Sequence, residues 1–158
     1  MGLKKSELST IEPKFSYLGS WHANLLHIDG KKCVLFVNDK TLFNFIAPNV
    51  KRQEIKNLSS MFEEHLMYAL SSEGVTDKTK EQIIKEYSEI NYSKTNSKKV
   101  LGSMNDLAFH YKHHILSEGG IFRAFVPDII NKLNHMPMGM LSYKYSSEEL
   151  KLLYENKI

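Results

Sequence analysis

The sequence contains a single cysteine, Cys33, so its 158 residues cannot form an internal disulfide. Disulfides are rare in reducing compartments, and this composition therefore favours a cytoplasmic protein. Cys33 stands in an apolar run, which indicates a buried, inert thiol and not a nucleophile. No hydrophobic run approaches the roughly 18 residues that a membrane span requires, and Lys4 and Lys5 are not followed by an apolar segment. We therefore expect neither a secretory signal nor a membrane association.

Arginine is also scarce, with Arg52 and Arg123 as the two examples in the chain. The net charge of +3 is spread over short lysine clusters. Because bidentate contacts to bases and phosphates depend on arginine, we expect at most a weak nucleic-acid contact. The chain has no nucleophile elbow, phosphate-binding glycine loop, HExxH motif or CxxC pair. These absences remove the strongest signatures of enzymes, and we expect no cofactor.

The chain does contain a clear strand pattern between residues 20 and 47. Its length and its hydrophobic content of 42% are those of one globular domain, residues 1–158. Apolar residues alternate over 20–28, Asp29-Gly30 forms a hairpin turn, and residues 32–38 are almost entirely apolar. A third run covers 41–47. The pattern predicts a small antiparallel sheet with the second strand in the centre, covered on both faces.

Helical periodicity dominates the rest of the chain, and residues 1–19 read as a polar, irregular tail. Four to five helices pack against the sheet, which makes the fold class α+β. The helices are predicted at residues 53–72, 77–90 and 97–117, after Pro127, and from Ser146, where Ser146 to Glu149 resemble a capping box.

Five polar residues are candidates for a functional site. His22 and Asn24 alternate with apolar residues on the first strand, and Asp39 follows the second strand. Asn105 and Asp106 interrupt a helix of good packing residues. A histidine beside carboxylates can perform acid–base chemistry, and we predict that the five gather in one region. The alternative is a polar sheet face whose side chains satisfy backbone groups.

Two weaker patterns concern ions. Asp106, His110 and His113 share one helix face and could supply three metal ligands. Because a fourth ligand is missing, we expect no tightly bound metal there. Before the same helix, Lys94, Thr95, Ser97 and Lys98 could bind an anion at the helix N-terminus, although we favour a solvated capping loop as their explanation.

Three sequence blocks together resemble an uncharacterised bacterial domain family of unknown function. The blocks are Ser20 to Leu26 (SWHANLL), Lys32 to Asp39 with Thr41 to Phe43 (KCVLFVND, TLF), and Lys94-Thr95 leading to Val100 to Asp106 (VLGSMND). The resemblance covers roughly residues 18–118. It implies a bacterial, cytoplasmic setting and transfers no active site.

Three classes of function remain open from the sequence. The first is a non-enzymatic interaction or regulatory protein, with a protein or nucleic-acid partner in a bacterial stress or phage-conflict setting. The second is a hydrolase or nuclease that uses His22, Asp39 and Asp106. The third is a small-ligand sensor. We favour the first because no complete catalytic set is visible.

Overall fold

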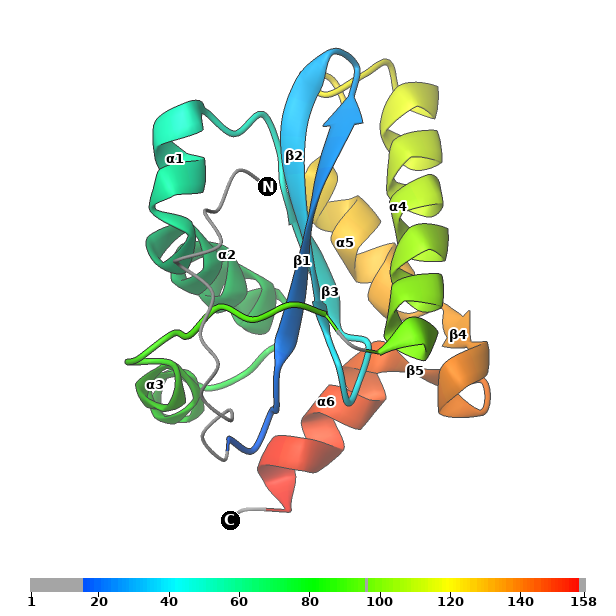
Figure 1. Cartoon of the computed structure of the whole chain (residues 1–158). Coiled ribbons are helices and arrows are strands. Elements are labelled where there is room, and N and C mark those ends of the chain that lie inside the picture. The colour runs from blue at the N-terminus through cyan, green and yellow to red at the C-terminus, as the bar shows by residue number, and fades with distance from the viewer. Residues whose placement is uncertain (1–15, 96, 157–158) are drawn as a thin grey trace.

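The computed structural model describes residues 16–95 and 97–156. Three strands form an antiparallel sheet in the order β1-β2-β3, with helices on both faces (Figure 1). This arrangement confirms the predicted α+β class. The strands of the sheet are β1 (Trp21–Ile28), β2 (Lys31–Asn38) and β3 (Asn44–Ala47). The helices are α1 (Arg52–Lys56), α2 (Leu58–Ser72), α3 (Asp77–Glu86), α4 (Lys98–Ser117), α5 (Val126–Asn134) and α6 (Ser146–Glu155).

The β1–β2 hairpin agrees with the prediction from the sequence. Asp29 and Gly30 have φ of 51° and 69°, and Ile28 pairs with Lys31 across the turn. Two successive residues with positive φ form the tight turn that matches the twist of a hairpin. Every residue from Cys33 to Asn38 is buried, and β2 lies between β1 and β3. The prediction of a central strand covered on both faces is confirmed.

The two faces of the sheet pack against different helices. On one face, Trp21, Phe36 and Phe45 surround Phe62 of α2, with ring centroids 5.3 to 6.0 Å from it. Because side chains alternate along a strand, His22 points to the other face, where it pairs with Val37. The helices α4 and α5 lie on that side (Figure 1).

A buried polar network joins β3 to these two helices. The side chain of Asn134 accepts the backbone N–H of Asn44 at 2.9 Å and donates to its carbonyl oxygen at 2.7 Å. The hydroxyl of Tyr111 donates to Asn44 Oδ1 at 2.7 Å. The amide of Asn134 thus pairs with the outer edge of β3 as another strand would.

The third strand begins at Asn44 and not at Thr41 as predicted. The backbone N–H groups of Lys40 and Thr41 donate to Asn38 Oδ1, and the N–H of Phe43 donates to Thr41 Oγ1. Leu42 has a φ of 56°. Side chains occupy the donors that a strand would use, so residues 39–43 form a loop.

Three helix predictions also need correction. The predicted helix 53–72 is broken at Asn57, whose ψ is 54° and whose side chain accepts the hydroxyl of Ser60. The predicted helix 77–90 ends at Glu86, and the hydroxyl of the next residue, Tyr87, accepts the indole N–H of Trp21 on β1. No capping box opens α6, since Ser146 already lies inside the helix and Tyr145 precedes it. Tyr145 belongs to β5 (Lys144–Tyr145), which pairs with β4 (Pro137–Met138) around the short helix η2 (Gly139–Leu141).

Among the described residues, no helix is both long enough and apolar enough to cross a bilayer.

Replacement of Tyr111 by Phe should lower the free energy of unfolding by about 1–3 kcal/mol, because Asn44 Oδ1 loses its donor in a dry interior. Urea unfolding measures the change. Tyr68→Phe is the matched control, since Tyr68 is 55% exposed and its replacement should leave stability unchanged. Equal stabilities of the two variants would contradict this account of the network.

Candidate functional site

A cavity of about 570 Å³ lies along β1. Its walls come from the start of β1, the loop after β2, helix α2 and the segment 87–95. That segment leaves α3 on one side of the sheet, crosses β1 and enters α4 on the other side (Figure 1). In the part of the chain that the structure describes, β1 is an outer strand, so the crossing segment covers a sheet edge.

The loop after β2 is shaped by the buried side chain of Asn38. Its Nδ2 donates to the carbonyl of Leu18 at 2.6 Å, and its Oδ1 accepts the hydroxyl of Thr41 as well as two backbone N–H groups. The backbone N–H of Asp39 donates to the carbonyl of Ser20 at 3.0 Å. These bonds fix the Asp39 carboxyl beside the first residues of β1.

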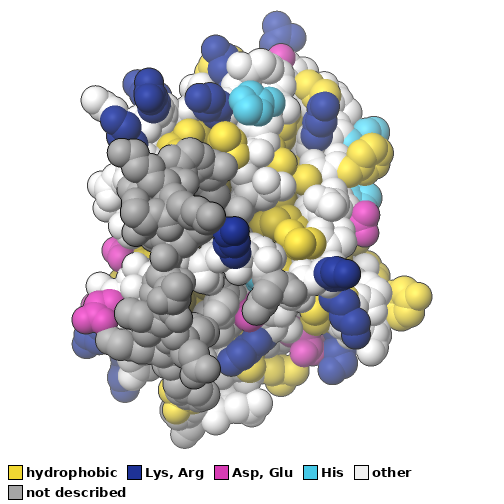
Figure 2. Space-filling model, in the orientation of Figure 1, with side chains coloured by type: hydrophobic (Ala, Val, Ile, Leu, Met, Phe, Trp, Pro, Cys, Tyr) yellow, Lys and Arg dark blue, Asp and Glu magenta, His cyan; other side chains and the backbone are white. Residues whose placement is uncertain are grey.

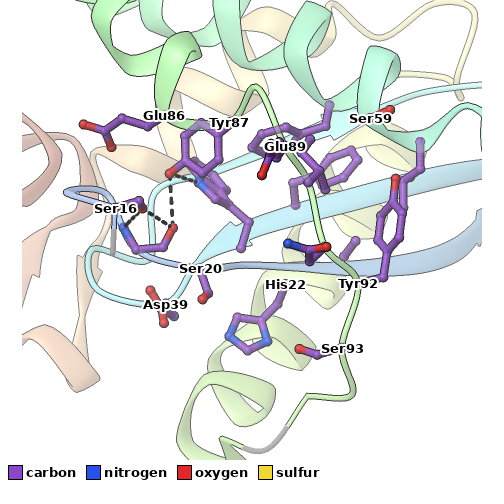
Figure 3. A pocket seen from close by; sticks show the side chains of 18 of the residues that line it. Ser16, Ser20, His22, Asp39, Ser59, Glu86, Tyr87, Glu89, Tyr92 and Ser93 are labelled. Atoms are coloured by element: carbon purple, nitrogen blue, oxygen red, sulfur yellow. Dashed lines mark hydrogen bonds between the residues drawn. The ribbon is translucent and has the colours of Figure 1, made fainter. Parts of the chain in front are cut away.

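Tyr87 attaches the crossing segment to β1. Its hydroxyl accepts the indole N–H of Trp21 at 2.9 Å and donates to the carbonyl of Gly19 at 3.1 Å (Figure 3). Burial raises the pKa of Tyr87 to about 12, so the phenol keeps its proton and both hydrogen bonds at neutral pH.

One wall of the cavity is aromatic. Trp21, Phe36 and Phe62 line it together, and the ring of Tyr87 meets that of Phe62 edge-on at 5.5 Å. Tyr92 lines the cavity from the crossing segment. Such a surface gives a planar or apolar ligand a large contact area.

The other wall carries His22 and Asp39. Figure 3 shows both on the same side of β1, with Ser20 between them. Burial lowers the pKa of His22, and the Asp39 carboxylate partly opposes that shift. Burial raises the pKa of Asp39, partly opposed by the charges of His22 and Lys40. Each group is thus displaced toward its neutral form by loss of water.

One carboxyl oxygen of this wall has no partner among residues 16–95 and 97–156. Within these residues, Asp39 Oδ1 is buried and forms no hydrogen bond. An unsatisfied buried acceptor costs about 1–3 kcal/mol, and more when it is charged. The cost falls when the carboxyl takes up a proton or when a donor group from a ligand reaches it.

Thr95 adds a hydroxyl to the polar wall. Its Oγ1 lies 3.3 Å from His22 Nδ1, and which of the two donates depends on the tautomer of the ring. Thr95 is exposed, whereas His22 is only 9% exposed. A solvent-accessible hydroxyl therefore lies beside a largely buried imidazole.

The structure brings some of the predicted site residues together and separates others. His22, Asp39 and Thr95 line the cavity. Asn24 is half-buried further along β1, and Asn105 and Asp106 are exposed on α4; none of these three is among the residues that line it.

The predicted anion site and metal site also separate from the cavity. Ser97 is the N-cap of α4 and accepts the N–H of Val100 at 3.3 Å, while Lys94 and Lys98 are exposed. His113 stacks on Phe109, with ring centroids 6.4 Å apart. Within residues 16–95 and 97–156, no group of three or more His, Cys, Asp or Glu side chains is arranged to hold a metal.

Sequence reasoning missed the roles of Trp21 and Tyr87. Trp21 was counted only as part of the first strand, and Tyr87 fell within the predicted helix 77–90, which ends one residue before it. Their hydrogen bond joins residues 66 positions apart, and no local pattern signals such a contact. The path of residues 91–95 across the sheet was not predicted.

Comparison with known families places the chain among proteins of unknown function. The model of the family described as a domain of unknown function (DUF6933) matches residues 1–149, which include every residue that lines the cavity. The chain belongs to the DUF6933 family. This match supports the resemblance to an uncharacterised family and assigns no activity to the cavity. None of the curated proteins matches the DUF6933 chain.

Stability of this DUF6933 protein should depend on His22 at mildly acidic pH. The folded-state pKa of His22 lies below its ordinary value of 6.5, so the unfolded chain takes up the proton first. The contribution of neutral His22 to the free energy of unfolding is therefore complete above pH 6.5, and it is lost as the pH falls through the folded-state pKa. Urea unfolding across this range should show that His22→Gln loses less stability than the wild type. His27→Gln, an exposed position on the same strand, is the control; equal pH slopes for the wild type and His22→Gln would contradict the burial of the imidazole.

Proposed function

We propose that the protein is a non-enzymatic regulatory protein that binds a small molecule in the cavity beside β1. The ligand has a planar or apolar part, which packs on the aromatic wall, and an N–H or O–H donor, which meets Asp39. The unpartnered Oδ1 of Asp39, in a cavity that also has an aromatic wall on the other side of β1, is the observation that carries the proposal. Binding pockets of proteins typically combine such an apolar lining with a few placed polar groups.

The size of the cavity supports this class of ligand. A volume of about 570 Å³ lies within the range of about 300–1,000 Å³ that small-molecule sites occupy. Burial lowers the pKa of His22 and raises that of Asp39, because the charged form of each group is poorly solvated there, so the site suits a neutral or weakly basic ligand better than an anionic one. Single hydroxyls of Ser20, Ser93 and Thr95 add further hydrogen-bonding groups around it.

The setting we propose is a bacterial cytoplasm. The free thiol of Cys33 is buried and fits a reducing compartment. A regulatory role implies a macromolecular partner whose binding the ligand would alter, and stress or phage conflict are settings in which such small regulators act.

A hydrolase is the second candidate, because Thr95, His22 and Asp39 form a hydroxyl, an imidazole and a carboxyl in one cavity. A neutral imidazole could accept the hydroxyl proton while Asp39 stabilises the resulting cation. This version uses Thr95 in place of Asp106. It predicts that a panel of p-nitrophenyl esters and phosphates is hydrolysed by the wild type and not by Thr95→Val.

The single tryptophan of the chain gives a direct assay for ligand binding, since Trp21 lines the cavity. Titration with nucleosides and aromatic amines should change its fluorescence in a saturable way for at least one compound. Asp39→Asn should lower the affinity for that compound about tenfold or more, because it removes the carboxyl that accepts the ligand's N–H or O–H group. His27→Gln, on the same strand, should bind as the wild type does.

Thermal unfolding without ligand separates a binding role from a structural one. If Asp39 is retained for binding, Asp39→Asn should melt at the same temperature as the wild type or higher, because it removes the charge from a buried, unpartnered carboxyl oxygen. A melting temperature lowered by several degrees would show that the carboxyl is structural and would contradict the proposal.

A further inference from the structure

Five cations gather at the end of the molecule that contains the β1–β2 turn, and we call this group the basic end. It consists of Lys31 and Lys32 at the start of β2, Lys51 and Arg52 at the start of α1, and Arg123 between α4 and α5. All five are exposed, and the two arginines of the chain are both among them. Figure 1 shows α1, the hairpin turn and the α4–α5 connection at this end, and Figure 2 shows several basic side chains there.

Specific contacts hold the three segments of the basic end together. The backbone N–H of Val50 donates to the carbonyl of Lys32 at 2.8 Å, which brings the start of α1 to β2. The backbone N–H of Ile121 donates to Asp29 Oδ2 at 3.2 Å, which ties the α4–α5 connection to the hairpin turn. The ammonium of Lys31 lies 5.6 Å from the centre of the Phe122 ring.

The carboxylates of this region bond to the backbone and not to the five cations. Asp29, Glu54 and Glu118 each accept a backbone N–H group, from Ile121, Lys51 and Phe125 respectively. Within the described ranges, none of the five cations forms an ion pair with a carboxylate. The five cations outnumber these three carboxylates, which keep their negative charge, and their ammonium and guanidinium groups are available to an external anion.

Aromatic rings alternate with these charges. Phe122 is 73% exposed and Phe125 is 60% exposed, and Arg123 lies next to Phe122 in the sequence. Two large aromatic side chains exposed in one region offer apolar surface that a partner can cover. Rings that present a face to solvent, bordered by cations, are the features with which proteins bind single-stranded nucleic acids.

We infer that the basic end binds single-stranded nucleic acid without sequence preference. Phosphates pair with the five cations, and a base stacks on Phe122 on the face that Lys31 leaves open, with a second base on Phe125. Specific reading of bases is not expected, because two arginines offer few bidentate contacts. This surface is separate from the cavity, which lies near the opposite end of β1.

An anionic membrane is the competing partner. Membrane-binding surfaces insert a continuous apolar patch below the headgroups. Here Lys31 covers part of Phe122 and Arg123 separates it from Phe125, so the apolar surface is interrupted by charge. The interleaved arrangement favours a nucleic-acid strand, whose phosphates and bases alternate in the same way.

Fluorescence anisotropy of a labelled oligothymidylate tests the inference with the full chain. Five phosphate contacts predict a slope of about −3.5 in log affinity against log salt, so raising salt from about 50 mM to about 200 mM should weaken binding roughly 100-fold. The double variant Lys31→Gln/Arg123→Gln should reduce the slope by about 1.4. Phe122→Ala should weaken binding roughly tenfold at constant salt, through loss of stacking.

Matched controls remove equal charge and equal exposed aromatic area elsewhere. Lys98→Gln/Lys99→Gln alters two exposed cations at the start of α4, and Phe109→Ala removes a ring that is 69% exposed. Both should bind as the wild type does, and unchanged melting temperatures confirm that all variants fold. An equal loss in these controls would overturn the assignment to the basic end.

Three further outcomes would also overturn the inference. One is the absence of binding to the oligothymidylate at about 50 mM salt, where phosphate contacts are strongest. Another is that duplex DNA binds as tightly as the single strand and that Phe122→Ala does not change either affinity. That result would exclude stacking. The third is co-sedimentation with phosphatidylcholine–phosphatidylserine vesicles, lost in Phe122→Ala, without binding to the oligonucleotide; that result would assign the surface to membranes.

Discussion

The hydroxyl of Tyr87 lies between two groups of the chain's first described segment, the indole N–H of Trp21 and the carbonyl of Gly19. This pair of hydrogen bonds decides where the chain runs after α3. It lies directly after the end of the helix at Glu86, where residues 87–95 turn across β1 toward α4. Without this attachment the start of the segment would have no fixed distance from the strand, while the contact between Thr95 and His22 holds the other end of the segment. The geometry of the candidate site therefore depends strongly on one half-buried phenol.

Buried amide side chains perform the same task elsewhere in the fold. Asn38 shapes the loop that presents Asp39, and Asn134 pairs with the edge of β3 through the backbone of Asn44. Each substitutes for backbone hydrogen bonds where a strand ends or has no neighbouring strand. Because a buried amide left unpaired costs about 1–3 kcal/mol, such residues tolerate few alternative conformations. Their hydrogen bonds fix the loops that adjoin the three-stranded sheet.

The two surfaces to which we assign binding lie near opposite ends of β1, roughly 20 Å apart for a strand of this length.

The parts of the fold that local patterns encode were predictable from the sequence. The Asp29-Gly30 turn, the apolar run of β2 and the stripe of α4 each follow from neighbouring residues and were identified correctly. The errors occur where a distant side chain overrides local preference. Asn38 delays the start of β3, and Tyr87 shortens α3, through contacts that no periodicity reveals. His22 and Asp39 were predicted to lie in one region, but the place of Thr95 beside them, and the exposed position of Asn105 and Asp106, depend on how the segments pack.

The attachment of the crossing segment to β1 can be measured through one resonance, because Trp21 is the single tryptophan. Its indole N–H gives one signal in an ¹H–¹⁵N spectrum of the wild type and of Tyr87→Phe. If the Tyr87 hydroxyl accepts the hydrogen bond of the indole N–H, the signal should move in the variant and the N–H should exchange faster with solvent. The free energy of unfolding should fall by about 1–2 kcal/mol. An indole signal with the same position and exchange rate in both proteins would show that the segment is not attached there, and the cavity as described would not exist.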